Sequence, residues 1–300
     1  MLSYRKLAMR VLGRPLHTEG IDSPRPASQR AAAFVLTAAM LITLAAPAFA
    51  GTWYIENGDI TVKAGETKGT NKVSQGENPE VEDTNTVITN SDKDKASSNT
   101  VTIEAKDKDD KVEVTLKDVN IDTSSRSEAA VSVTGEGNTN IELDGDNALK
   151  SDIYSSGISS SGSLTISGGE NDSLTAQGGS GENGGDGIFS FGRVAISGGT
   201  VNATGGVGSS RNGGSGIYSS NSSVTISGGT VNAAGGNGNF SGGCGIYNSG
   251  SLIISDGTVN ATGGNGKDGY GGYGISSSDV AISGGTVNAN GGDSKDGYGG

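Results

Sequence analysis

The 300-residue chain is poor in the residues that fill the cores of globular proteins. Aromatic residues make up 5% of it, whereas glycine occurs 53 times. Because large side chains dominate ordinary cores, this composition argues against a close-packed globular domain. Cys244 is the only cysteine, which excludes an intramolecular disulfide. The only histidine, His17, lies near the N-terminus, so the remainder of the chain has none.

Basic residues are also scarce beyond the N-terminal segment. Residues 51–300 carry 15 basic and 31 acidic residues, a net charge of −16. Such an excess repels nucleic acid and anionic lipid, and it leaves carboxylates free to meet divalent cations. We therefore expect no nucleic-acid partner and no membrane partner for the processed chain.

Only one long apolar run is present, "AAAFVLTAAMLITLAAPAFA" at residues 31–50. Basic residues precede it, and Ala48-Phe49-Ala50 closes it, which is the pattern of a secretory signal peptide cleaved after Ala50. An uncleaved membrane anchor is the alternative, because about 20 apolar residues can span a bilayer. Either way residues 1–50 predict export, and the protein is expected to be secreted or held on the bacterial cell surface through a region that follows Gly300.

What the chain does have is a repeat. The phrase "ISGGTVNATGG" stands at residues 196–206, and close copies begin at Ile166, Ile226, Ile254 and Ile282. A second set of isoleucines recurs with spacings of 30, 29, 29 and 29, at Ile158, Ile188, Ile217, Ile246 and Ile275. Within each phrase apolar and polar residues alternate, as in strands with one buried face. One unit cannot bury its inner face alone but stacked copies can, so the period of 28–30 residues predicts an all-β solenoid, a parallel β-helix.

The repeat also predicts the domain organisation. Residues 158–300 form regular coils, residues 100–157 form irregular ones, and residues 51–99 form a partly irregular N-terminal cap. The inner ladder is expected to contain Ile166, Ile196, Ile226, Ile254 and Ile282, and Leu116 and Leu143 are expected at the same position in the irregular coils. The chain ends within a repeat, so we expect the solenoid to continue beyond it.

Two acidic turns are candidate calcium sites, because calcium prefers oxygen-rich, flexible loops. The candidate ligands are Asp107, Asp109 and Asp110 in the first turn and Asp144, Asp146 and Asn147 in the second. A solvated acidic surface is the alternative. The glycine-rich strings, such as "GGSGENGGDG" at 178–187, lack both the Lys-Ser/Thr ending of a phosphate loop and the nine-residue period of calcium-binding repeats, so they are interpreted as loops.

An aromatic residue follows the aligned isoleucine in three successive units, at Phe189, Tyr218 and Tyr247. Stacked coils place these rings about 4.8 Å apart, as a platform on which the C–H faces of sugar rings can pack. The alternative is that the rings only stabilise the stack. Asparagine also recurs once per unit, at Asn202, Asn232, Asn260 and Asn288, and we expect these side chains to hydrogen-bond between coils.

The units "GSLTISGG", "ISGGTVNATGG" and "GIYSS", preceded by "VTLKDVNI" and "NIELDGDNAL", resemble a carbohydrate-binding β-helix family of exported proteins of clostridia and related Gram-positive bacteria. The resemblance covers about residues 53–300. It implies a right-handed parallel β-helix, calcium as a bound ion, and attachment to plant-type polysaccharide such as cellulose or acidic pectin. No individual binding residue of that family can be matched to this chain.

The expected function is therefore a non-catalytic, adhesin-like protein that binds polysaccharide, either of the plant cell-wall type or another glycan. A calcium-dependent polysaccharide lyase of the pectate type is an alternative, which would need a basic side chain beside the metal to remove a proton. The mature chain offers only Arg126, Arg193 and Arg211 beside scattered lysines, which favours binding over catalysis. A structural surface stalk is the third possibility.

Overall fold

A computed structural model describes residues 50–220, 222–295 and 298–300. The predicted signal peptide, apart from its last residue, lies outside the described residues. Residues 48–300 form one compact unit, and nearly all of its regular structure is β-strand. The one helical element among the described residues is the single 3-10 turn η1 (Ile55–Asn57).

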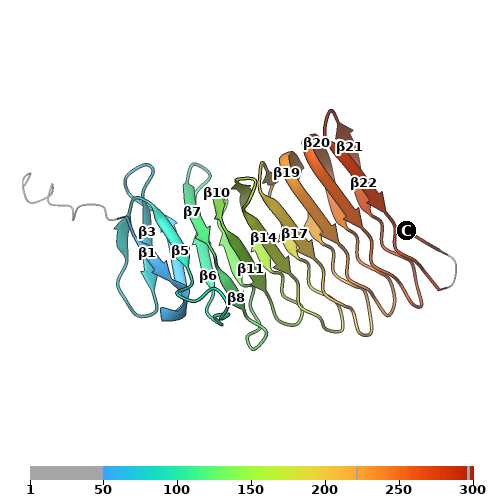
Figure 1. Cartoon of the computed structure of the whole chain (residues 1–300), viewed down its shortest axis with the longest axis horizontal. Coiled ribbons are helices and arrows are strands. Elements are labelled where there is room, and N and C mark those ends of the chain that lie inside the picture. Colours follow the sequence, from blue (N-terminus) through green and yellow to red (C-terminus); the bar gives the residue numbers. More distant parts are fainter. Residues whose placement is uncertain (1–49, 221, 296–297) are drawn as a thin grey trace, which may run out of the picture. The chain divides into compact units, whose positions relative to one another are not determined.

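The strands wind into a parallel β-helix, as the repeat predicts, with coils that follow one another from β1 to β22 (Figure 1). Each regular coil contributes one strand segment to each of three parallel sheets, here called walls A, B and C. Wall A contains β1 (Thr52–Tyr54), β5 (Thr86–Thr89), β7 (Lys111–Lys117), β10 (Asn138–Asp144), β13 (Ser163–Gly168) and β16 (Val194–Ile196). Wall B contains β8 (Asn120–Asp122), β11 (Asp146–Lys150), β14 (Ser173–Gln177), β17 (Thr200–Thr204) and β22 (Thr286–Asn290). Wall C contains β2 (Ile60–Ala64), β6 (Val101–Glu104), β9 (Val131–Thr134), β12 (Ile158–Ser160), β15 (Ile188–Ser190) and β18 (Ile217–Ser219).

Three later strands bend from one wall into the next. They are β19 (Val224–Ala234), which joins walls A and B, β20 (Ile246–Thr262), which passes through all three, and β21 (Ile275–Ile282), which joins walls C and A. Since the walls recur in the order C, A, B, each coil repeats the path of its predecessor, and equivalent residues stand directly above one another.

Inward side chains form the predicted aliphatic ladders. In wall A, Ile166 pairs in register with Ile196, and the ladder continues through Ile226 and Ile254, all fully buried. Ile282, in the last coil of the described residues, continues the register and is 55% exposed. Each of the four regular coils up to β20 buries two branched aliphatic side chains in wall A and one in each of walls B and C, and such burial stabilises a fold by about 1.5–3 kcal/mol per side chain.

The register of the irregular coils differs from the sequence prediction. Leu116 and Leu143 pair with each other, but Leu143 lies beside Gly168 rather than Ile166. The residues that pair with Ile166 are Ile141 and, one coil earlier, Val114. The predicted and the observed residues are two positions apart and therefore on the same face of the strand, so the period of two identifies the buried face but not the rung partner.

The N-terminal end is covered by antiparallel strands. β2 pairs with β3 (Asn71–Gln75), and β3 pairs with β4 (Val81–Asp83), both antiparallel. Asp83 is fully buried, and its carboxylate accepts hydrogen bonds from the indole Nε1 of Trp53 (2.7 Å) and the backbone N of Gly51 (2.9 Å). β3 and β4 thus cover the edge of β2, the first strand of wall C, which could otherwise pair with another chain.

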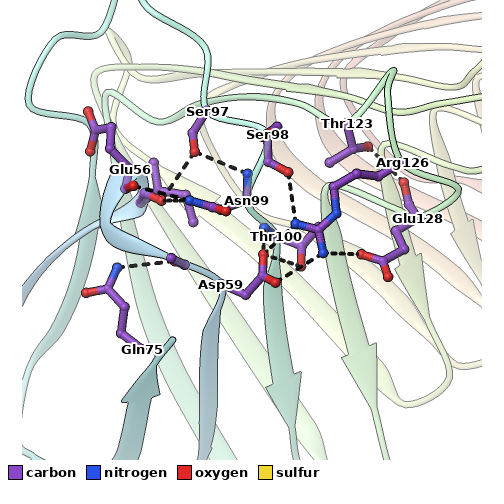
Figure 2. Close-up of polar contacts among 12 residues, drawn as sticks. Glu56, Asp59, Gln75, Ser97, Ser98, Asn99, Thr100, Thr123, Arg126 and Glu128 are labelled. Carbon is purple, nitrogen blue, oxygen red and sulfur yellow. Dashed lines mark hydrogen bonds and ion pairs between the residues drawn. The ribbon is translucent and has the colours of Figure 1, made fainter. Parts of the chain in front are cut away.

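A polar network fastens this cap to the following coils (Figure 2). Arg126 donates to Asp59 on β2's N-terminal side and to Glu128 (Nη2 to Oε2, 2.9 Å). The amide of Asn99 donates to the carbonyl oxygen of Ile55 in η1 at 2.9 Å. These bonds join the start of the chain's first coil to the next two, and they give Arg126 a structural role.

Glycine serves two different purposes. At the corner between walls A and B, Gly199 and Gly229 have positive φ, 72° and 75°, a conformation that glycine adopts without the steric penalty of a Cβ. The corner therefore needs glycine at these positions.

The longer glycine-rich strings are not irregular loops. Residues 178–187, 205–216, 235–245, 263–274 and 291–300, apart from the undescribed positions 296 and 297, pack as a layer of backbone, here called the glycine layer. Within it Gly214 N donates to Gly206 O (3.0 Å), and Gly236 N donates to Gly214 O (2.8 Å), a pattern that continues from coil to coil. A Cβ on Gly214 would collide with the carbonyl of Gly185. Glycine is therefore required here for close backbone approach rather than for flexibility.

Candidate functional site

The first acidic turn, between β6 and β7, is closed by its own hydrogen bonds. Asp107 N donates to Asp110 Oδ2, and Asp110 N donates to Asp107 O, each at 2.9 Å. Asp109 and Asp110 line a polar cleft of about 580 Å³ under the β2–β3 turn, together with Glu113 and Glu142. Asp107 is not among the residues that line it, so the three predicted ligands face different surroundings.

The second acidic turn, between β10 and β11, is also dispersed. Asp144 accepts from the ammonium of Lys117 (2.7 Å), and Asp146 accepts from the hydroxyl of Ser173 (2.8 Å). Asn147 is 2% exposed, and its Oδ1 accepts from Val119 N at 2.9 Å. Asn147 thus completes the backbone bonding of the coil instead of facing a ligand. Among the described residues, no group of three or more His, Cys, Asp or Glu side chains is arranged to hold a metal ion.

Phe189, Tyr218 and Tyr247 stand on successive rungs of wall C, as predicted. The ring centroids of Phe189 and Tyr218 are 5.4 Å apart with planes 19° apart, and those of Tyr218 and Tyr247 are 4.8 Å apart with planes 16° apart. The edge of Phe191 packs against Phe189, at 4.8 Å and 88°. Within the ladder, both faces of Tyr218 and one face each of Phe189 and Tyr247 are therefore covered by a neighbouring ring.

This geometry limits what the aromatic ladder can bind. A sugar ring packs on an open aromatic face, and the faces between neighbouring rings of the ladder are occupied. The stacking is the arrangement expected of cross-strand aromatic pairs that stabilise a sheet. It supports the alternative in which Phe189, Tyr218 and Tyr247 hold coils together.

A column of polar residues lies beside this ladder, two positions before each wall C isoleucine: Asp186, Ser215, Cys244 and Tyr273. Asp186 Oδ1 accepts from Ser215 N at 2.6 Å. Burial raises the pKa of Asp186 to about 7, against the opposing effect of that hydrogen bond. Burial, and to a smaller extent Asp186, also raise the pKa of the Cys244 thiol. A nucleophilic cysteine needs a lowered pKa, so this column is not arranged to activate Cys244.

The outer surface of wall B presents three outward residues in each of five coils, and none of them is charged. We call these fifteen outward residues of β14, β17, β19, β20 and β22 the Thr–Asn face. They are Ser173, Thr175, Gln177, Thr200, Asn202, Thr204, Thr230, Asn232, Ala234, Thr258, Asn260, Thr262, Thr286, Asn288 and Asn290. One coil earlier wall B is charged, with an ion pair between Lys150 and Asp122 at 2.9 Å.

An amide ladder runs through the middle of the Thr–Asn face. Asn232 Nδ2 donates to Asn202 Oδ1, Asn260 to Asn232 and Asn288 to Asn260, each at 2.8 Å. The predicted hydrogen bonding of these asparagines between coils is thereby confirmed. Each amide has two N–H groups and two acceptor lone pairs, so the amides within the ladder keep one N–H and one lone pair each after the bonds to the neighbouring coils.

The Thr–Asn face was not identified as a surface from the sequence, although its signal is present. The phrase "TVNAT" places threonine, asparagine and threonine at every second position, which shows that they share a face. To see that the three ladders are continuous and uncharged, the coils must be aligned residue by residue. The register of β17, β19 and β20 provides this alignment.

The described residues contain no helix with the length and hydrophobicity of a membrane span. Comparison of the chain with protein-family models, with curated proteins and with solved structures gives no match.

Proposed function

We propose that this protein is an exported, non-catalytic β-helix that binds a neutral, hydroxyl-rich polysaccharide through the Thr–Asn face. The observation that carries the proposal is the absence of charge from the fifteen residues of that face. Surfaces of soluble domains usually carry about 25–35% charged residues, and this chain has a net charge of −12. A large uncharged surface on such a protein fits a partner that is itself uncharged and polar.

The chemistry of the face fits hydroxyl groups. Threonine hydroxyls and asparagine amides both donate and accept hydrogen bonds, as sugar hydroxyls do, and short side chains keep the surface level. The ladders repeat once per coil, at about 4.8 Å, so a regular polymer can make the same contact several times. Repeated weak contacts of this kind add up to useful affinity when they are made simultaneously.

The same features favour a neutral glycan over an acidic one. The carboxylates of the irregular coils, such as Asp109 and Glu142 in the cleft, repel a polyuronate unless a cation bridges them. The dependence of binding on calcium therefore tests the proposal. If calcium mediates attachment to an acidic polysaccharide, a chelator will abolish that attachment, whereas binding through the Thr–Asn face does not need the ion.

The proposal is tested by co-sedimentation of the processed chain with insoluble cellulose, chitin and calcium pectate, with and without chelator. We expect retention on a neutral polymer in both conditions. Absorbance from unsaturated sugar products would instead reveal a lyase. Absence of both retention and product from a folded protein would leave the stalk as the function.

A pair of matched variants tests the surface. Ala234→Lys with Thr262→Lys places two charges on adjacent coils of the Thr–Asn face, and Thr225→Lys with Ile253→Lys places two on adjacent coils of wall A. We expect the first pair to lose most of the retention and the second to keep it. Equal retention of the two would exclude the Thr–Asn face as the binding surface.

A further inference from the structure

The first residue after the predicted signal-peptide cleavage bond is buried in the cap. Ala50 is exposed, whereas Gly51 is buried, so the chain passes from solvent into the fold between these two residues. The backbone N of Gly51 donates to Oδ1 of Asp83 at 2.9 Å, and its carbonyl oxygen accepts from Val87 N at 3.1 Å. These two bonds fix the start of β1 against the end of β4 and against β5.

Asp83 is a fully buried carboxylate without a cationic partner. Its three hydrogen bonds come from neutral N–H groups, those of Gly51, of Asn85 (N to Oδ1, 3.0 Å) and of the Trp53 indole (Nε1 to Oδ2, 2.7 Å). None of the ion pairs in the part of the chain that the structure describes involves Asp83. Burial of a charge is costly unless the charge is paired as well as hydrogen-bonded, so this position calls for a positive group.

The space around Gly51 admits no side chain. A Cβ added at this position would lie 2.6 Å from Nε1 of Trp53 and 2.8 Å from Oδ2 of Asp83. Because the indole donates to that same carboxylate oxygen, neither group can move away without weakening their bond. Glycine is therefore required here for close approach, and what it brings to Asp83 is its nitrogen.

We propose that removal of the signal peptide supplies the positive group, because cleavage after Ala50 turns the N–H of Gly51 into an ammonium that pairs with Asp83. The cleavage is a hydrolysis, in which water adds across the amide bond. The carboxylate stays on Ala50, and the new amine of Gly51 is protonated at neutral pH. The bond to Asp83 thereby becomes charge-assisted, and such bonds are about twice as strong as neutral ones.

This pairing makes processing a step in the assembly of the cap. In the precursor, Asp83 keeps an uncompensated charge, whereas in the processed chain an ion pair anchors the residue that precedes β1. Since the cap covers the edge of β2, this end of the solenoid becomes fully stable only after the signal peptide has been removed. The role depends on export but not on polysaccharide binding, so the two proposals can fail independently.

The cleavage position is tested on the full chain. Mass spectrometry of the product that cells export from it should show a first residue of Gly51. A product that begins at any other residue would overturn the inference, because no ammonium would then stand at Gly51.

The pairing itself is tested by comparing residues 51–300 with residues 48–300, which are the whole compact unit and have an amide at Gly51. Trp53, the only tryptophan, donates to Asp83, so its fluorescence reports unfolding of the cap. We expect the 51–300 chain to melt about 5–10 °C higher, since a buried charge that lacks its partner is strongly destabilising. Asp83→Asn should remove this difference, which a double-mutant cycle measures.

A second measurement does not need the Asp83→Asn variant to fold. An acylating reagent at neutral pH labels free α-amino groups, and mass spectrometry locates the label. Gly51 of the folded 51–300 chain should react far more slowly than Ala48 of the 48–300 chain, because its amine is buried and paired, and the two should react equally after unfolding. Equal melting temperatures, or equal labelling of the two folded chains, would overturn the inference and show that neutral N–H groups suffice for Asp83.

Discussion

The guanidinium of Arg126 donates to both carboxylate oxygens of Asp59, from Nη1 to Oδ1 at 2.8 Å and from Nη2 to Oδ2 at 3.1 Å, across 67 positions of the chain. Asp59 also accepts from the backbone N of Thr100 at 2.8 Å. This carboxylate is thus the point at which the cap, the second coil and the loop that contains Arg126 meet (Figure 2). A two-bonded arginine–carboxylate pair is stronger and more directional than a single contact.

Replacing Arg126 with alanine is therefore expected to destabilise the N-terminal end. The Asp59 side chain is 48% exposed, so water screens the pair and the expected loss is about 1–2 kcal/mol. Burial alone would raise the pKa of Asp59, but the bonds from Arg126 and Thr100 outweigh it and hold that pKa below its ordinary 3.8. The contribution is hence present above pH 4 and is lost as the pH falls through the lowered pKa.

Chemical unfolding of Arg126→Ala at pH 7 and at pH 3, monitored by the fluorescence of Trp53, measures this effect. Trp53 is the only tryptophan and lies in the cap. The difference from the wild type should shrink at pH 3. Arg193→Ala, at an exposed position of the regular coils, is the control, and an equal loss there would contradict the specific role of the Arg126–Asp59 pair.

The architecture was predictable because one physical requirement recurs in every coil. Residues such as Ile196 and Ile217 must meet their own counterparts, so their spacing records the length of a coil. In the irregular coils the same reasoning selected Leu143 instead of Ile141 as the partner of Ile166, since both point inward and only the turn geometry distinguishes them.

The candidate site was less accessible to such reasoning. Spacing predicts that Phe189, Tyr218 and Tyr247 lie above one another, but it does not give the tilt of the rings, which decides whether a face is open. The glycine strings were interpreted as loops because they match neither a phosphate loop nor a nine-residue calcium-binding repeat. Gly214 instead faces another backbone segment at close range. This packing depends on hydrogen bonds between coils, and such bonds leave no periodic pattern of apolar residues in the sequence.

The glycine layer yields a second prediction. Gly214→Ala adds a methyl group where the carbonyl of Gly185 already lies, so the layer must open locally. Overpacking of this kind usually costs about 1–3 kcal/mol and sometimes more. We expect a lower melting temperature and new protease cleavage between 205 and 216. Gly299→Ala, where the nearest atom to an added Cβ is 3.7 Å away, is the matched control. Similar behaviour of both variants would contradict the close-packed layer.

The third prediction concerns Asp186, whose pKa burial raises to about 7 from an ordinary 3.8. Apart from Ser215, Asp186 interacts electrostatically with Tyr218 and Cys244, and neither of these groups adds a positive charge. Because the unfolded chain gives up this proton more readily than the folded one, stability falls as the pH rises from about 4 to about 7 and levels off above it. Since one pKa unit corresponds to about 1.4 kcal/mol, the full effect is about 4 kcal/mol at most.

Asp186→Asn keeps an oxygen that can accept from Ser215 N but carries no charge, so we expect it to remove this pH dependence. The variant should equal the wild type at pH 4 and exceed it in stability at pH 8, as measured by denaturant unfolding at several pH values. Asp268→Asn removes a charge at an exposed position of the same layer and should leave the profile as it is. A wild-type profile that is flat between pH 4 and 8, or an Asp186→Asn variant less stable than the wild type at pH 8, would show that water or a cation reaches this carboxylate and that the column beside the aromatic ladder is open.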